Sequence, residues 1–205
     1  MTSSASLYKD YEKKMQRAEL FKLLTEHYSI KKAMYPGSYI HISPSFYIPE
    51  VVYIDTDAKA KRFFKDDSFK QLIEERKKYS NETIVRFYST SFKQVIPEEE
   101  GSFDLIISQY AGPVSLNCKK FLKSGGYLVA NNSHGDAGIA DLDSSFKLIA
   151  VINFRGGKFY HSTKNLDSYF LPKKKELEVT LDYLLEIKKG IGYTKTASHY
   201  LFQKN

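Results

Sequence analysis

The sequence has few of the features that mark secreted, membrane or disulfide-bonded proteins. It contains one cysteine, Cys118, so no internal disulfide can form, and this fits a reducing cytoplasm. No apolar run approaches the roughly 18 to 20 residues that span a bilayer. The N-terminal segment lacks the apolar core of a signal peptide. These absences predict a cytoplasmic protein with no membrane partner.

Motifs for several kinds of chemistry are also missing. There is no cluster of Cys and His residues at zinc-binding spacing, and no phosphate-binding loop with Lys and Ser or Thr. Cys118 falls inside an expected helix without a partner base in view, so we interpret it as a packing residue rather than a nucleophile. We therefore predict no metal site and set aside zinc and P-loop chemistry.

Apolar strands alternate with helical segments along most of the chain, and this pattern predicts an α/β fold. Strands separated by helices form a mostly parallel sheet covered on both faces. Near the C-terminus, Gly156 and Gly157 separate two strand-like runs, which must pair as an antiparallel hairpin. The run KKAMYPG at 31–37 predicts a strand that ends at Pro-Gly. The other expected strands are 51–55, 84–88, 103–108, 126–131, 147–154 and 158–163, with 198–204 as a possible last strand. The expected helices cover 7–28, 58–79 with an interruption near 66–67, 113–123 and 176–189.

Small or polar residues follow the strands at the edge where parallel sheets bind ligands. They are Pro36, Gly37 and Ser38, then Asp55 and Thr56, then Ser91 and Phe92, then Ser108 and Gln109, and after the fifth strand His134. Polar loops alone could account for most of this set. The acid Asp55 is more informative, because a carboxylate at the end of the second strand can accept both hydroxyl hydrogens of a ribose.

The run of motifs resembles the class I S-adenosylmethionine-dependent methyltransferases over about residues 30 to 165. The most specific piece is the segment FLKSGGYL at 121–128, which is similar to the family's Gly-Gly entry into the fifth strand. The resemblance implies a Rossmann-like methyltransferase sandwich with a seven-stranded sheet in the order 3-2-1-4-5-7-6. We expect one domain over 1–205, with a helical addition over 1–30, a core over 30–165 and a C-terminal addition over 166–205.

The resemblance also implies a cofactor and its contacts. S-adenosylmethionine would bind Asp55 through its ribose and the turn Pro36-Gly37-Ser38 through its amino-acid end, with S-adenosylhomocysteine as the product. Thr56, Ser91, Phe92, Ser108 and Gln109 complete the expected cofactor set. The chain departs from the family by keeping one glycine, Gly37, in the first turn, and by carrying Ser91 where an acid is usual. We read the first turn as rebuilt, and the implied function is a methyltransferase of unknown acceptor.

Other interpretations of the same residues remain open. Asp55-Thr56-Asp57 is the arrangement by which a glycosyltransferase could hold a metal on a sugar nucleotide, but Asp57 is also well placed to cap the next helix. The protein could also be a non-catalytic, methyltransferase-like binding protein, since fold does not determine function. His134 is the best available general base, although its surroundings favour a turn, and His41 is open to the same doubt.

The charge of the chain bears on its partners. The net charge is +7, and residues 147–205 carry 11 Lys and Arg against 5 Asp and Glu. Such a region could attract nucleic acid or another anion. However, the Asn/Asp-Pro-Pro-Tyr sequence of amino-directed DNA methyltransferases is absent, and no nucleic-acid motif appears. We favour a small-molecule acceptor narrowly, keep nucleic acid as the alternative, and leave the oligomeric state open.

Overall fold

The computed structural model describes residues 3–15 and 18–205, which form two compact units, Met1–Pro97 and Glu98–Asn205. The described residues contain eight strands in an α/β arrangement, mostly parallel and finished by antiparallel strands, so the expected fold class is confirmed. The sequence predicted a seven-stranded sheet and a possible last strand at 198–204; that strand is present and makes the eighth. No helix in the described part of the chain is long and apolar enough to cross a membrane.

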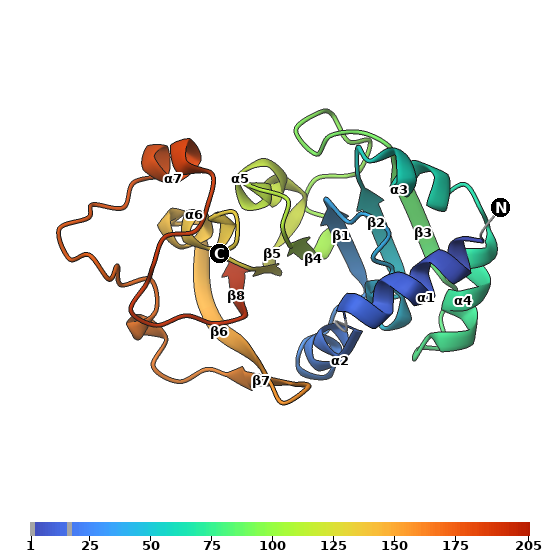
Figure 1. Cartoon of the computed structure of the whole chain (residues 1–205), viewed down its shortest axis with the longest axis horizontal. Coiled ribbons are helices and arrows are strands. Elements are labelled where there is room, and N and C mark those ends of the chain that lie inside the picture. Colours follow the sequence, from blue (N-terminus) through green and yellow to red (C-terminus); the bar gives the residue numbers. More distant parts are fainter. Residues whose placement is uncertain (1–2, 16–17) are drawn as a thin grey trace. The chain divides into compact units, whose positions relative to one another are not determined.

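The first unit is built on three parallel strands in the order β3-β2-β1 (Figure 1). All three were predicted: β2 and β3 are short runs with β-branched and aromatic residues, and β1 is a short apolar run that ends at Pro-Gly. They are β1 Lys32–Pro36, β2 Glu50–Ile54 and β3 Ile84–Tyr88. The helices of this unit are α1 Ser4–Met15, α2 Ala18–His27, α3 Ala58–Phe63 and α4 Ser68–Arg76. The expected helix 7–28 thus corresponds to α1 and α2, with residues 16–17 outside the described residues.

The connection between β1 and β2 has no α-helix. Residues 37–49 contain only a 3-10 turn, η1 Ser43–Phe46, whose four residues are all buried. The buried hydroxyls of this connection have partners, because Ser43 Oγ lies 2.6 Å from the Tyr8 hydroxyl and Ser45 Oγ lies 2.6 Å from the Tyr53 hydroxyl. The two N-terminal helices pack over this part of the unit, α1 against α4 and α2 against η1.

The second unit contains five strands in the order β4-β5-β8-β6-β7. Only β4 and β5 are parallel; β8 is antiparallel to both β5 and β6, and β6 is antiparallel to β7. Their bounds are β4 Phe103–Ser108, β5 Leu122–Ala130, β6 Phe146–Arg155, β7 Lys158–Ser162 and β8 His199–Lys204. The hairpin around Gly156-Gly157 is confirmed. The helical elements are α5 Val114–Cys118, η2 Lys119–Phe121, α6 Asp136–Leu142, η3 Leu166–Ser168 and α7 Leu181–Ile187.

Three boundaries in the second unit differ from the prediction. The expected helix 176–189 is only α7, because Thr180 caps its first turn by accepting the N–H of Tyr183 and Lys188 ends it at a φ of 50°. The strand expected over 126–131 begins earlier, at Leu122, so Gly125 lies inside β5 with a φ of 76°. The expected order 3-2-1-4-5-7-6 is wrong at its end, because β8 lies between β5 and β6 and the strand expected over 158–163, β7, lies at the edge of the sheet.

Candidate functional site

The turn after β1 is bound to the neighbouring strand through its backbone. The N–H groups of Gly37 and Ser38 both donate to the carbonyl oxygen of Ile54, at 2.7 and 3.4 Å. Gly37 has a φ of 66°, which glycine adopts at little cost. Tyr39 has a φ of 49°, which is unusual for a residue with a side chain. The rebuilt turn therefore forms, but it places a tyrosine in a conformation that favours glycine.

Asp55 follows β2 and is held by this turn. Its Oδ2 accepts the N–H of Tyr39 at 2.6 Å, and its Oδ1 accepts the N–H of Asp57 at 2.8 Å. An ionised carboxylate offers about four acceptor positions, so about two remain after these bonds are made. The carboxylate is half-buried and its orientation is determined from both sides. This is the geometry that a ribose-binding acid needs.

The two ends of the expected cofactor fit this turn unequally. The ribose end fits, because Asp55 is fixed and keeps acceptor capacity. At the amino-acid end, the N–H groups of Gly37, Ser38 and Tyr39 are all engaged within the unit. A ligand there would therefore contact carbonyl oxygens or the Ser38 hydroxyl, and Ser38 is almost fully buried.

The other acid of the Asp-Thr-Asp sequence has a structural role. Asp57 is the N-cap of α3, and its Oδ1 accepts the N–H groups of Lys59 at 2.6 Å and Ala60 at 3.3 Å. Within the described residues, no three His, Cys, Asp or Glu side chains are grouped to hold a metal ion. The arrangement favours helix capping over metal binding by Asp55 and Asp57.

Ser91 and Phe92 lie in the loop after β3, and both are half-buried. The carbonyl oxygen of Ser91 accepts the N–H of Gln94 at 2.9 Å, and its hydroxyl oxygen accepts the N–H of Lys93 at 3.3 Å. These bonds make a local turn. With Pro36, Gly37, Ser38, Asp55 and Thr56, these residues belong to the first unit.

Ser108 is the last residue of β4 in the second unit and Gln109 follows it, and both side chains are buried. The Ser108 hydroxyl donates to Oδ2 of Asp136, which also accepts from Ser115. Oδ1 of Asp136 accepts the Ser115 hydroxyl at 2.5 Å. Burial raises the pKa of Asp136 above its usual range, although the hydrogen bonds from Ser108 and Ser115 act in the opposite direction. This buried cluster was not predicted, because its members are far apart in sequence.

The two histidines considered as bases lie in different surroundings. His134 is exposed, with its Nδ1 3.0 Å from the Ser133 hydroxyl and its ring in an edge contact with Tyr110. It lies in the turn that precedes α6, so the turn expected there is present and its side chain remains accessible. His41 is buried, 3.0 Å from the Tyr35 hydroxyl and in ring contact with Tyr11 and Phe21. We therefore interpret His41 as a packing residue.

No protein-family model and no curated protein matches the sequence. Solved structures match it by fold. A candidate O-methyltransferase from Klebsiella pneumoniae is 10% identical, with a TM-score of 0.51 over 92% of this chain and 80% of that one. A candidate S-adenosyl-L-methionine-dependent methyltransferase from Methanococcus maripaludis is 14% identical, with a TM-score of 0.44 over 63% of each chain.

The YcgJ protein from Bacillus subtilis is 17% identical, with a TM-score of 0.41 over 55% of this chain. The match spans 50% of the YcgJ chain, as it spans 63% of the Methanococcus protein. Similarity at such low sequence identity is evidence for the fold alone. The Klebsiella structure supports the fold assignment, because that match extends over most of both chains. The chain therefore shares the α/β fold of this candidate O-methyltransferase, which is the fold class that the sequence motifs predicted.

Proposed function

We propose that the protein is an S-adenosylmethionine-dependent methyltransferase whose acceptor is unidentified. The observation that carries this proposal is the position of Asp55. It follows the second strand of a methyltransferase-like fold, and the N–H groups of Tyr39 and Asp57 hold its carboxylate. The carboxylate keeps acceptor positions for the two ribose hydroxyls of the cofactor.

The residues of the chain would bind and orient the cofactor, which supplies the methyl group when bound. Asp55 would hold the ribose, and the turn at Gly37 and Ser38 would lie against the amino-acid end. Methyl transfer depends mainly on alignment of the acceptor, so positioning can supply much of the acceleration. If the acceptor must lose a proton, the exposed imidazole of His134 is the group that we propose to take it.

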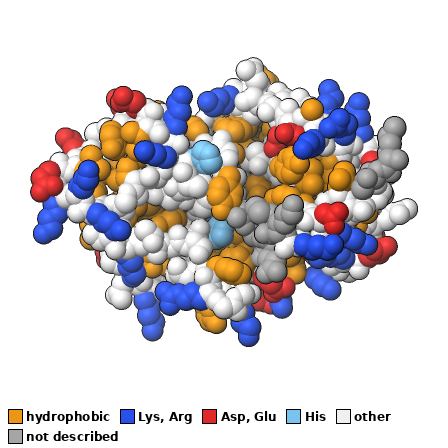
Figure 2. All heavy atoms as spheres, in the orientation of Figure 1, with side chains coloured by type: hydrophobic (Ala, Val, Ile, Leu, Met, Phe, Trp, Pro, Cys, Tyr) orange, Lys and Arg blue, Asp and Glu red, His pale blue; other side chains and the backbone are white. Residues whose placement is uncertain are grey.

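The acceptor that we propose is a small molecule. On the face shown in Figure 2, Lys and Arg side chains are spread among neutral and acidic ones rather than gathered in one patch. Nucleic-acid binding usually requires a continuous basic surface. The lysine-rich segment 147–205 keeps a nucleic-acid acceptor as the alternative, and its affinity would fall steeply with salt.

A second candidate is a binding protein that keeps the fold without methyl transfer. The first turn favours it, because the N–H groups of Gly37, Ser38 and Tyr39 are engaged internally. The side chain of Tyr39 adds bulk where the methyltransferase family usually has glycine. Such a protein could still bind a nucleoside at Asp55, so cofactor binding and methyl transfer need separate measurements.

Calorimetric titration with S-adenosylhomocysteine and S-adenosylmethionine tests the proposal. We expect binding to the unaltered protein and a loss of about 1.5 to 3 kcal/mol for each charge-assisted hydrogen bond removed by Asp55→Ala. Asp57→Ala is the matched control, because it removes a neighbouring carboxylate that caps α3. No heat with either ligand at millimolar concentration would overturn cofactor binding. Binding without methyl transfer to any acceptor tested would favour the second candidate.

A further inference from the structure

The outer edge of β3 is open in the first unit. β3 is the last strand of the order β3-β2-β1, and the N–H of Ile84 and the carbonyl of Tyr88 both bond toward β2. In a parallel ladder, alternate residues direct their backbone groups to opposite sides. The N–H and C=O groups of Val85 and Phe87 therefore point away from β2, toward the free edge.

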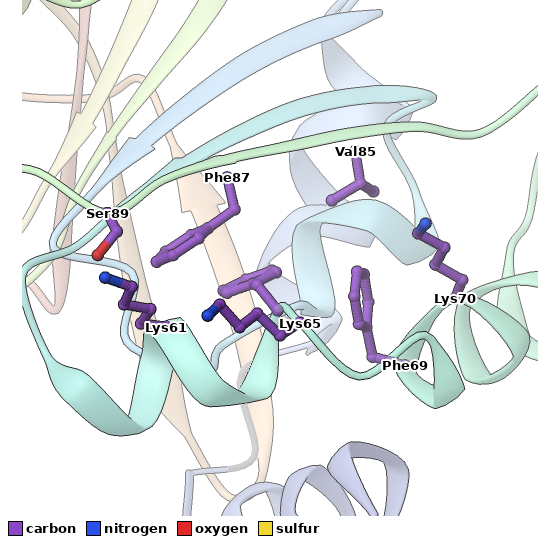
Figure 3. A pocket seen from close by; sticks show the side chains of 8 residues that line it. Lys61, Lys65, Phe69, Lys70, Val85, Phe87 and Ser89 are labelled. Atoms are coloured by element: carbon purple, nitrogen blue, oxygen red, sulfur yellow. The ribbon is translucent and has the colours of Figure 1, made fainter.

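A cavity of about 340 Å³ lies beside this edge, between β3 and the two helices α3 and α4. Its volume is within the range of small-molecule pockets. Figure 3 shows the side chains that line it, which come from these three elements, the turn between the helices and the residue that follows β3. They are Lys61, Phe64, Lys65, Phe69, Lys70, Val85, Phe87 and Ser89.

One wall of this cavity is aromatic. The rings of Phe64 and Phe87 are stacked, with their centroids 4.3 Å apart and their planes 11° apart. Phe69 meets Phe64 edge-on at 5.3 Å. Phe87 is half-buried, and among the described residues of the first unit no strand lies beyond β3. A planar ring placed against Phe87 would extend the existing stack and gain the energy of aromatic contact.

The cavity also carries positive charge that the unit does not neutralise. Lys70 is paired with Asp67 at 2.7 Å. Lys61 and Lys65 are exposed, and neither forms an ion pair with any described residue. Figure 3 shows their amino groups on the side of the cavity where Phe87 and Ser89 lie. Lysine amino groups are strongly hydrated point charges that commonly bind phosphate.

We propose that this cavity binds a nucleotide, either free or as a unit of a single strand. The base lies against Phe87, where stacking needs only a flat ring and tolerates any base. The phosphate lies between the amino groups of Lys61 and Lys65. The outward N–H and C=O groups of Val85 and Phe87 are available to the polar edge of the base. An acidic peptide would satisfy the charges but would leave the aromatic wall without a planar partner.

This site is separate from the proposed cofactor contacts. Neither Asp55 nor the turn 36–39 lines the cavity. The inference therefore does not rest on the proposed function, and its failure would leave methyl transfer untouched. It also predicts that a nucleotide and S-adenosylhomocysteine bind the protein at the same time.

Equilibrium binding of AMP and of a 12-nucleotide single-stranded RNA of mixed sequence, at low salt, tests the proposal. We expect at least one probe to bind and Lys61→Gln with Lys65→Gln to weaken it about tenfold or more. The matched control is Lys9→Gln with Lys78→Gln, which removes two exposed charges of the same unit outside the cavity. Its affinity should stay within about twofold of the unaltered protein. Phe87→Leu, which keeps an apolar side chain, should weaken binding severalfold.

The two probes distinguish the source of the nucleotide. Lysine-dependent binding of AMP indicates a free nucleotide, whereas lysine-dependent binding of the RNA alone indicates a strand. The proposal is overturned if neither probe binds, or if the control variant loses as much affinity as the cavity variant. It is also overturned if S-adenosylhomocysteine displaces AMP, or if a poly-glutamate peptide binds the cavity lysines more tightly than either probe. Circular dichroism of each variant confirms that it is folded.

Discussion

Two aspartates of this protein lie where the chain passes from a strand to a helix, yet their surroundings differ. Asp55 ends β2 in the first unit and is half-buried, with one backbone N–H on each carboxylate oxygen. Asp136 starts α6 in the second unit and is 2% exposed. Its oxygens accept from the hydroxyls of Ser108 and Ser115 and from the Ser115 N–H.

The comparison shows that burial decides whether an aspartate is available to a ligand or stabilises the fold. A carboxylate at the surface of the unit can accept further hydrogen bonds without losing its present ones. A buried carboxylate is expensive unless the protein satisfies it, and once satisfied it connects the elements that supply its donors. Asp55 therefore remains available, whereas Asp136 joins the end of β4 to the start of α5.

The largest effect should come from Asp136→Ala. The change leaves the hydroxyls of Ser108 and Ser115 and the Ser115 N–H without their acceptor in a buried place. Unsatisfied buried groups cost about 1 to 3 kcal/mol each, so we expect the free energy of unfolding to fall by about 3 kcal/mol or more. Urea denaturation followed by circular dichroism measures this.

Asp182→Ala provides the control for Asp136→Ala. Asp182 is exposed in the first turn of α7, in the same unit, and its loss should cost less than about 1 kcal/mol. If the two variants unfold at the same urea concentration, the buried cluster does not stabilise the second unit, and the contrast between the two aspartates is wrong.

Asp55→Ala should have a smaller effect on stability. The N–H groups of Tyr39 and Asp57 lose their carboxylate acceptor, but water can reach both and partly replace it. We therefore expect the free energy of unfolding to fall by about 1 to 2 kcal/mol. Differential scanning calorimetry with and without S-adenosylhomocysteine separates the two roles of this residue. The ligand should raise the melting temperature of the unaltered protein and fail to raise that of the variant. A stability loss as large as that of Asp136→Ala would make Asp55 a structural residue too.

Asp57→Ala should cost about 1 kcal/mol, because it removes the N-cap of α3. Its effect on ligand binding should be negligible, since within the described residues its carboxylate accepts the backbone N–H groups of Lys59 and Ala60 in α3. Thermal unfolding of Asp57→Asn, which retains a capping side chain, should recover most of the lost stability. Loss of ligand binding in both Asp57 variants would instead revive a role for the second acid of the Asp-Thr-Asp sequence.

Much of the fold could be predicted because local sequence carries it. Short apolar runs placed β1 to β7 within a few residues, and the Gly-Gly turn identified the β6–β7 hairpin. Pairing between distant strands is not a local property, so the position of β8 between β5 and β6 could not be read from the segment 199–204. The packing of α1 and α2 near the connection between β1 and β2 likewise joins segments that are distant in sequence, such as Tyr8 and Ser43.

In the candidate site too, local features could be predicted from the sequence and contacts between distant residues could not. Asp55 and the one-glycine turn were expected from their places at strand ends and from the family resemblance, and the capping of α3 by Asp57 was anticipated. The hydrogen bond from the Tyr39 N–H to Asp55 depends on a tyrosine with positive φ, which no propensity favours. The link between Ser108 and Asp136 depends on which strand ends face the start of α6, and this is known only once the chain is folded.

The smallest expected effect is an absence of reaction at Cys118. Its thiol is fully buried in α5, and burial, with a further contribution from the Asp136 carboxylate, raises its pKa to about 12. An ordinary thiol ionises near 9.0, so at pH 8 it is partly thiolate and reacts. The folded protein should not react with a thiol-specific reagent at pH 8, and the same protein in urea should react at once. Above about pH 9 the unfolded thiol ionises and the folded one does not, so this group lowers stability as pH rises.

Labelling of Cys118 also compares the two units directly, because the thiol reports opening of the second unit alone. Asp136→Ala lowers the cost of that opening, so its labelling rate at pH 8 should rise by an order of magnitude or more if labelling follows the open population. Asp57→Ala weakens α3 in the first unit and should leave the rate unchanged. Equal acceleration in both variants would mean that the units open together, and that the surroundings of Asp55 and Asp136 are not independent.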